Sequence, residues 1–164
     1  MQIDPDVYAL AEEIIAAART QKLTLATVES CTGGLVAGAL TAVPGSSDVF
    51  YGGYVTYANE AKLGMVGVPY GVLREFGAVS KEVAAALAEG GLAATGTHLC
   101  LAVTGIAGPG GGSADKPVGL VHFAVAGDAG TRALKKNFAG LDRAGVRQQS
   151  VVEALKLLRK AVGD

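Results

Sequence analysis

Tryptophan is absent from this chain of 164 residues, and aromatic residues make up only 5% of it. An excess of charge is also missing, because 14 lysines and arginines against 15 acidic residues leave a net charge of −1. Proteins that bind nucleic acids or anionic membranes carry a basic patch, and single-stranded nucleic acid also stacks on aromatic rings. The composition therefore argues against both kinds of partner.

Cysteine and histidine are limited to two residues each. Cys31 and Cys100 lie in or beside apolar stretches, so we expect free thiols in a reducing compartment rather than a disulfide framework. His98 and His122 stand in apolar strand patterns, where a structural histidine is the more usual case. This placement disfavours a Ser-His-Asp triad and a Cys-His pair. None of the four has the short spacing that zinc prefers, so no metal site is predicted.

A leader segment and a membrane span are also not indicated. The stretch from Met1 to Asp6 lacks a basic region followed by an apolar one, and no apolar run reaches the ~18 residues of a membrane helix. Hydrophobic residues make up 50% of the chain and charged residues 18%, which is typical of a well-packed globular domain. We therefore predict a single cytoplasmic domain over residues 1–164.

The stretch from Glu29 to Gly34 is the first candidate for chemistry. It follows an apolar run and precedes a helical pattern, so we expect a strand that turns directly into a helix. The unpaired N–H groups of such a helix start could hold an oxyanion beside Ser30, Thr32 or Cys31. Taken alone, the stretch is more simply explained as a Ser/Thr helix cap with glycines for a tight turn.

Helical and strand patterns alternate along the chain, with one hairpin near the end. This order predicts a three-layer α/β/α domain with a mixed, mainly parallel sheet. Ligands of such sheets bind where strands end at the carboxyl edge. Two glycine-rich strand ends, after Val28 and after Val103, are expected to meet there and form a pocket. The predicted elements are helices from Pro5, Gly34, Asn59, Pro69, Ser80 and Asp142, and strands at 23–28, 50–57, 98–103, 118–126 and 132–138.

Lys62 is the candidate base for this pocket. With Asn59 as helix cap, Lys62 falls in the first helical turn, where the helix dipole opposes a cation. That opposition and partial burial would lower the pKa of the lysine and make it a usable general base. Tyr57, at the end of its strand, could relay or orient a proton beside it. The alternative is an ordinary solvated lysine beside a half-buried tyrosine.

The stretch from Thr104 to Ser113 is the most glycine-dense part of the chain. Such a loop after a buried strand can form a nest of N–H groups for a phosphate, with Lys116 or Arg143 supplying positive charge. It matches neither a Walker loop nor the G-x-G-x-x-G fingerprint. A mobile surface loop explains its composition equally well.

Six short motifs follow one another along the chain: residues 29–34 (ESCTGG), 44–47 (PGSS), 55–62 (VTYANEAK), 77–80 (GAVS), 104–109 (TGIAGP), and 111–113 (GGS) with 116–119 (KPVG). In this order they resemble the CinA C-terminal domain family, the nicotinamide mononucleotide deamidases, over essentially the whole chain. The resemblance implies hydrolysis of the carboxamide of nicotinamide mononucleotide to nicotinic acid mononucleotide and ammonia, without a metal or other cofactor. It also implies a five-stranded mixed sheet, and this chain is identified as the domain alone, without the larger N-terminal one of many members.

The resemblance places the family's serine nucleophile on Ser30, its lysine on Lys62 and its active-site tyrosine on Tyr57. Its threonine or serine before Gly-Ile-Ala-Gly falls on Thr104, and its late arginine falls on Arg143. The arginine usually follows Gly-Asp, whereas this chain has Leu141-Asp142, so Arg143 is the least secure transfer. The remaining residues expected to bind substrate or hold the oxyanion are Thr32, Gly33, Gly34, Gly105, Gly108, Gly111 and Gly112.

The residue pattern and the family resemblance predict the same mechanism. Neutral Lys62 would take the proton of Ser30, N–H groups near Thr32, Gly33 or Thr104 would hold the oxyanion, and Arg143 with the glycine loop would hold ribose and phosphate. We expect nicotinamide mononucleotide as the small-molecule substrate, a homo-oligomer as the assembly, and no nucleic acid or membrane as partner.

Rival functions are a nucleotide-binding regulatory module without catalysis, and a different amidohydrolase or phosphate-ester enzyme using the same pocket. A Ser-Lys peptidase is disfavoured because it has no use for anion-binding glycine loops. The competence/damage-inducible name of the family suggests a role in DNA uptake or repair. The sequence has no basic patch that would support such a role.

Overall fold

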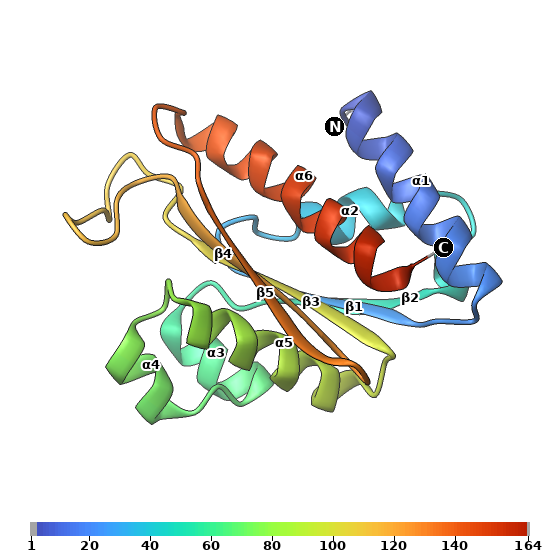
Figure 1. The fold of residues 1–164 in the computed structure, drawn as a ribbon, viewed down its shortest axis with the longest axis horizontal. Coiled ribbons are helices and arrows are strands. Elements are labelled where there is room, and N and C mark those ends of the chain that lie inside the picture. The colour runs from blue at the N-terminus through green and yellow to red at the C-terminus, as the bar shows by residue number, and fades with distance from the viewer. Residues whose placement is uncertain (1–2, 164) are drawn as a thin grey trace.

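A computed structural model describes residues 3–163 as one sheet between two layers of helices (Figure 1). The sheet has five strands in the order β2-β1-β3-β4-β5. Strand β1 pairs in parallel with β2 and β3, whereas β4 pairs antiparallel with β3 and β5. The predicted α/β class with a mixed five-stranded sheet is therefore confirmed. The strands are β1 (Leu25–Glu29), β2 (Phe50–Val55), β3 (Leu99–Gly105), β4 (Leu120–Gly127) and β5 (Gly130–Asn137).

Each face of the sheet has its own apolar core and its own helices. In Figure 1, α1, α2 and α6 lie on one face and α3, α4 and α5 on the other. Leu25, Leu101 and Phe123 point into the core under α1, α2 and α6, while Val28 and Ala102 point into the core under α5. The helices are α1 (Pro5–Thr20), α2 (Leu35–Thr41), α3 (Asn59–Val66), α4 (Tyr70–Phe76), α5 (Lys81–Thr95) and α6 (Arg143–Val162), with a short 3₁₀ helix at Ser46–Asp48.

Three helices begin at polar capping residues, close to the helix starts that the sequence predicts. The side chains of Asp4, Ser80 and Asp142 accept hydrogen bonds from backbone N–H groups in the first turns of α1, α5 and α6. Each cap satisfies donors that the helix itself cannot pair, which fixes where the helix starts. Among residues 3–163, none of these helices is both long and apolar enough to cross a membrane.

Helix α5 packs closely on the sheet and on α3 because it carries two successive glycines. A Cβ at Gly91 would lie 2.5 Å from Val28 and 2.6 Å from Cys100, and one at Gly90 would overlap the carbonyl oxygen of Val66. A larger side chain at either position would push the helix away from these neighbours. The close approach lets α3, which carries Lys62, sit directly against the helix that covers this face.

The carboxyl ends of β1 and β3 lie side by side. Glu29 pairs with Val103, and the amide of Ser30 donates to the carbonyl of Val103 at 3.0 Å. The two glycine-rich loops that follow these strands therefore start from the same edge of the sheet, as predicted. This edge holds the site described below.

The bounds of α3 and β4 differ from the prediction. Asn59 is the first residue of α3 instead of its cap, which is Ala58. The helix also continues through Gly64 to Val66, because its packing on α5 outweighs the cost of one glycine. The predicted strand from Val118 begins only at Leu120, since Gly119 (φ +96°) turns the chain there.

Candidate active site

A cavity of about 250 Å³ opens at the carboxyl edge of β1 and β3. It is called the Ser30 cavity below. Its walls come from the turn after β1, the start of α3, the loop before α5, the loop after β3 and the first residue of α6. The lining residues are Ser30, Cys31, Tyr57, Asn59, Lys62, Ala78, Val79, Thr104, Gly105, Ile106, Ala107, Gly108, Gly110, Gly111 and Arg143.

Ser30 and Lys62 meet at the inner end of this cavity. Lys62 Nζ lies 3.2 Å from Ser30 Oγ, 2.8 Å from the carbonyl oxygen of Thr56 and 3.2 Å from that of Tyr57. The lysine is only 1% exposed, so its amine is shielded from bulk water. The solvated-lysine alternative raised by the sequence is therefore excluded.

The surroundings of Lys62 favour its neutral form. Burial lowers the pKa of the amine, and no carboxylate within residues 3–163 forms an ion pair with it. A neutral amine has two N–H donors and one lone pair. Because a carbonyl oxygen can only accept, the two protons go to Thr56 and Tyr57, and the lone pair faces the hydroxyl of Ser30. The geometry thus suits proton transfer from Ser30 to Lys62.

Glu29, immediately before Ser30, fixes the helix that follows the turn. Its carboxylate is 1% exposed and accepts three backbone hydrogen bonds, from Gly34 (3.0 Å) and Val36 (3.1 Å) to Oε2 and from Ala37 (2.8 Å) to Oε1. The start of α2 is therefore capped by a side chain from the preceding strand. Gly34 (φ +97°) lets the chain enter the helix from the turn.

This cap limits which N–H groups of the turn remain for an oxyanion. Gly33, expected as one such donor, uses its N–H on the carbonyl of Ser30 at 3.0 Å. Within the described chain, the backbone N–H groups of Cys31 and Thr32 have no acceptor. They are the two donors left in the turn that follows the serine.

Arg147 holds the same turn from the other side. Its Nε donates to the carbonyl of Cys31 at 3.0 Å, and its NH2 to the carbonyl of Thr32 at 3.3 Å. Neither Arg147 nor Glu29 was identified from the sequence. Glu29 directly precedes the turn and Arg147 lies one helical turn beyond Arg143, but these positions alone do not predict bonds to the backbone of the turn.

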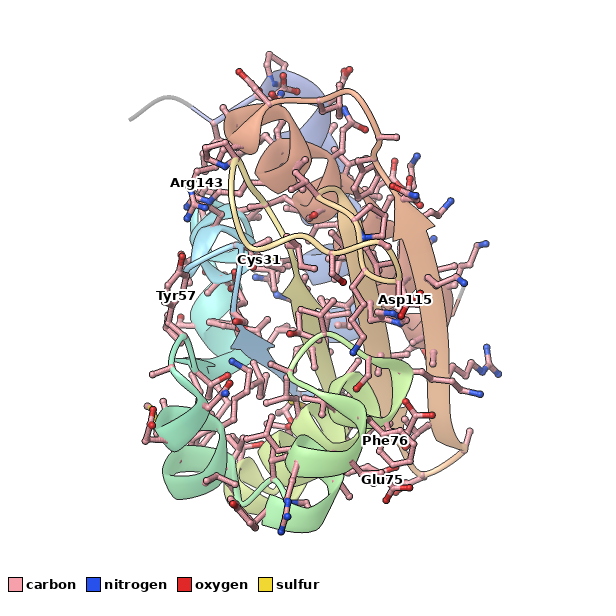
Figure 2. All side chains as sticks on the ribbon, turned by 90° about the vertical axis from the view of Figure 1, so that its left-hand side faces the viewer. Cys31, Tyr57, Glu75, Phe76, Asp115 and Arg143 are labelled. Atoms are coloured by element: carbon pink, nitrogen blue, oxygen red, sulfur yellow. The ribbon has the colours of Figure 1, made fainter. Side chains whose placement is uncertain are left out.

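Tyr57 contributes through its backbone to Lys62 and through its phenol to Arg143. The guanidinium of Arg143 donates to Tyr57 Oη at 2.9 Å and to the carbonyl of Gly108 at 2.7 Å. Figure 2 shows Tyr57 and Arg143 on one side of the molecule, with Cys31 deeper behind them. The expected contact between the phenol and Lys62 is not formed in the described structure, in which the phenol belongs to the rim of the cavity.

The glycine loop after β3 supplies one wall of the Ser30 cavity. Of the residues expected to bind substrate, Thr104, Gly105, Gly108, Gly111 and Arg143 line it, whereas Thr32, Gly33, Gly34 and Gly112 do not. Thr32 is completely buried. The amides of Gly33 and Gly34 are already bonded within the protein. Gly112 instead lies against Val118.

Lys116 lies away from the Ser30 cavity. Its Nζ donates to the carbonyl of Phe76 at 2.5 Å, and it lines a separate hollow beside Asp115 and His122. In Figure 2, Asp115 and Phe76 lie on the side opposite Tyr57 and Arg143. Of the two cations considered for a phosphate, Arg143 is thus the one at the cavity.

The other reactive groups do not form a competing site. His98 and His122 do not line the Ser30 cavity, and residues 3–163 hold no group of three metal-ligating side chains. Burial raises the pKa of the Cys31 thiol to about 11, so the thiolate is scarce near neutral pH. Ser30 is therefore the group best placed to act as a nucleophile.

A family model described as the CinA C-terminal domain matches residues 7–162. A CinA-like protein of Geobacter metallireducens is 54% identical over 142 residues, which cover 87% of this chain and 34% of that protein. A CinA-like protein of Synechococcus is 51% identical over 94% of this chain and 37% of that protein. The chain spans about a third of the length of these relatives.

Solved structures match over nearly the whole chain. The crystal structure of the competence/damage inducible protein CihA from Agrobacterium tumefaciens superposes with a TM-score of 0.95 at 44% identity, covering 100% of both chains. A CinA superfamily protein from Escherichia coli gives a TM-score of 0.90 at 32% identity, covering 98% of this chain and 94% of that one.

Proposed function

This chain belongs to the CinA C-terminal domain family, and we propose that it is an amidohydrolase of nicotinamide nucleotides. In the proposed reaction, nicotinamide mononucleotide and water give nicotinic acid mononucleotide and ammonia. One observation carries the proposal. Lys62 is buried, has no acidic partner among the described residues, and lies 3.2 Å from a serine hydroxyl inside a cavity. A solvent-shielded Ser-Lys pair of this kind can activate a nucleophile for acyl transfer.

The first half of the reaction forms an ester on Ser30. Lys62 takes the hydroxyl proton while Ser30 Oγ attacks the carbon of the carboxamide, and the carbonyl oxygen becomes an oxyanion. Lys62 then returns the proton to the amide nitrogen, the C–N bond breaks, and ammonia leaves. The N–H group of Cys31, which lines the cavity, is the candidate oxyanion donor and is worth about 3 kcal/mol of transition-state stabilisation.

The second half hydrolyses the ester with the same groups. Water attacks the acyl carbon while Lys62 accepts its proton, and the proton returns to Ser30 Oγ as the C–O bond to the serine breaks. The nicotinic acid nucleotide is released with a free carboxylate. In each half-reaction Lys62 accepts one proton and gives one back, so the protein returns to its starting state.

The charges around the cavity support a substrate with an anionic end. No carboxylate lines the Ser30 cavity, and Arg143 lies at its rim. A second cavity of about 650 Å³ shares Ala107 and Arg143 with the first and extends to Arg147. Neither arginine forms an ion pair within residues 3–163. We propose that the ribose and phosphate extend from the first cavity toward the guanidinium group of Arg143, which lines both cavities.

Product analysis tests the proposal. The purified chain is incubated with nicotinamide mononucleotide in the presence of a chelator, and ammonia and the acid product are quantified. Wild-type protein should form both in equal amounts, while Ser30→Ala and Lys62→Met should lose at least about 1000-fold in rate with an unchanged circular dichroism spectrum. Binding of the nucleotide without turnover would identify the regulatory module instead. Full activity of Ser30→Ala would transfer the nucleophile to Cys31, which lines the same cavity.

The remaining parts of the proposal concern the cellular setting. We place the chain in pyridine-nucleotide salvage in the cytoplasm, as a homo-oligomer. Light scattering on the purified protein measures the assembly, and a molar mass equal to one chain would contradict it.

A further inference from the structure

We infer that Thr104 selects a primary carboxamide over an ester or an acid, because it offers the substrate an oxygen that can only accept hydrogen bonds. The inference rests on the proposed function and assigns Thr104 a specific chemical task within it. Three observations lead to it: the direction of one hydrogen bond, the position of Thr104 beside Ser30, and the burial of its side chain.

The hydroxyl proton of Thr104 is already used. Thr104 Oγ1 lies 2.7 Å from the carbonyl oxygen of Ala78, and a carbonyl oxygen can only accept, so the hydroxyl must donate. No group within residues 3–163 donates a hydrogen bond to Oγ1 in return. A ligand in the cavity therefore meets the lone pairs of this oxygen and cannot receive a proton from it.

Thr104 stands next to the nucleophile. Glu29 pairs with Val103 at the end of β1 and β3, and Ser30 and Thr104 directly follow this pair and both line the Ser30 cavity. Paired residues of neighbouring strands project to the same face, and such strands lie about 4.8 Å apart. Both side chains contact the same helical layer, Ser30 through Lys62 of α3 and Thr104 through the loop before α5. A group bonded to the carbon that Ser30 attacks is within reach of Thr104 Oγ1.

Because Thr104 is buried, its oxygen can distinguish a ligand that donates a hydrogen bond from one that does not. Thr104 is 1% exposed and lines the Ser30 cavity, so water has little access to replace a missing partner. The two other acceptors nearby, the carbonyls of Thr56 and Tyr57, are already occupied by Lys62. A buried polar atom left without its partner is costly, and sites built around one reject ligands that cannot supply the partner.

A carboxamide, an ester and a carboxylate differ in the hydrogen-bonding groups that they place beside Thr104. The NH₂ of a carboxamide brings two donors, an ester oxygen brings none, and a carboxylate brings only negatively charged acceptors. The amide is therefore bound, the ester finds no partner, and the carboxylate of the product is repelled. In the tetrahedral intermediate, one N–H of the substrate donates to Thr104, so the nitrogen lone pair points away from this oxygen. The lone pair therefore remains free to take the proton that Lys62 returns.

The experiment compares two substrates that share the same acyl group and differ only in its leaving group, NH₂ or OCH₃. Nicotinamide mononucleotide and the methyl ester of nicotinic acid mononucleotide are assayed with wild type, Thr104→Val and Thr104→Ser. Valine has the shape of threonine without its oxygen, whereas serine keeps the hydroxyl. We expect the amide-to-ester ratio of kcat/KM to fall about 10- to 100-fold in Thr104→Val and to stay within about threefold of wild type in Thr104→Ser.

The affinity for the product should change in the opposite direction: Thr104→Val should lose activity on the amide and bind the acid product more tightly. Calorimetric titration with nicotinic acid mononucleotide should show tighter binding to Thr104→Val than to wild type, because the repelling oxygen is gone. Equal losses on amide and ester, with unchanged product affinity, would overturn the inference and leave Thr104 as a support for the Ala78 loop. If wild type hydrolyses neither substrate, the proposed function fails, and the relative affinities for the amide and acid nucleotides still decide the role of Thr104.

Discussion

Replacing Glu29 by glutamine should destabilise the protein severely although the two side chains have nearly the same shape. The carboxylate accepts three backbone hydrogen bonds while buried between β1 and α2. Glutamine has only one oxygen. Placing it at the Oε2 position keeps the bonds from Gly34 and Val36, but the NH₂ group then faces the N–H of Ala37, so that two donors oppose each other.

The magnitude follows from these three bonds. The two retained bonds change from charge-assisted to neutral acceptors, which costs about 1 kcal/mol each, and the lost bond leaves a buried donor unsatisfied for about 2 kcal/mol more. The total is about 4 kcal/mol, a large part of the 5–15 kcal/mol that stabilises a typical domain. With a urea slope of about 2 kcal/mol per molar, the midpoint of unfolding should fall by about 2 M.

Urea unfolding followed by circular dichroism measures this shift. The matched control is Glu60→Gln, because Glu60 is exposed in the first turn of α3 and has no hydrogen bond or ion pair among the described residues. Its free energy of unfolding should change by less than about 0.5 kcal/mol. A shift below about 0.5 M for Glu29→Gln, at an unchanged slope, would refute the account of the turn given above.

Four further predictions test the site and the packing around it. The acidic limb of the pH–rate profile should lie below the ordinary lysine value of 10.5, because burial lowers the pKa of Lys62 and only the neutral amine accepts a proton; a limb at 10.5 speaks against Lys62 as the base. Arg147→Met should lower kcat about tenfold or more with little change in KM, since the turn loses two bonds; an effect on KM alone assigns the arginine to substrate binding instead. Thermal unfolding should show that Gly91→Ala costs about 1–3 kcal/mol, since its Cβ enters the packed core, whereas Gly38→Ala gains up to about 1 kcal/mol in open space; equal effects would contradict the packing described. Iodoacetamide at pH 8 should leave the native Cys31 unmodified and the activity intact, because burial raises the pKa of the thiol to about 11; rapid labelling with loss of activity would favour a cysteine nucleophile.

Local signals were sufficient for most of the fold. The caps Asp4, Ser80 and Asp142 are each read from a single polar residue before an apolar stripe, and all three start helices in the structure. The boundaries of α3 were less predictable. Gly64 suggests a helix end, but contacts with α5 are made by residues distant in the sequence and outweigh the local preference.

For the site, too, some features could be predicted from local sequence and others depend on tertiary packing. Ser30 and Lys62 were identified from their positions at helix starts, yet their distance of 3.2 Å depends on how α3 packs beside β1. The anchoring roles of Glu29 and Arg147 could not be read from spacing, because each bonds to backbone groups placed by tertiary structure. Tyr57 illustrates the limit most clearly, since the sequence places it beside Lys62 but does not reveal that its phenol turns to Arg143.

The amine of Lys62 is held by two main-chain oxygens, those of residues 56 and 57, rather than by neighbouring side chains. Substitution at either position alters what projects from the chain without removing the atoms that orient the amine. Because the side chain of Tyr57 lies at the rim of the cavity, evolutionary drift at that position can change which molecules enter while the amine keeps both of its acceptors. Insertions or deletions between β2 and α3 are the changes that this arrangement does not tolerate.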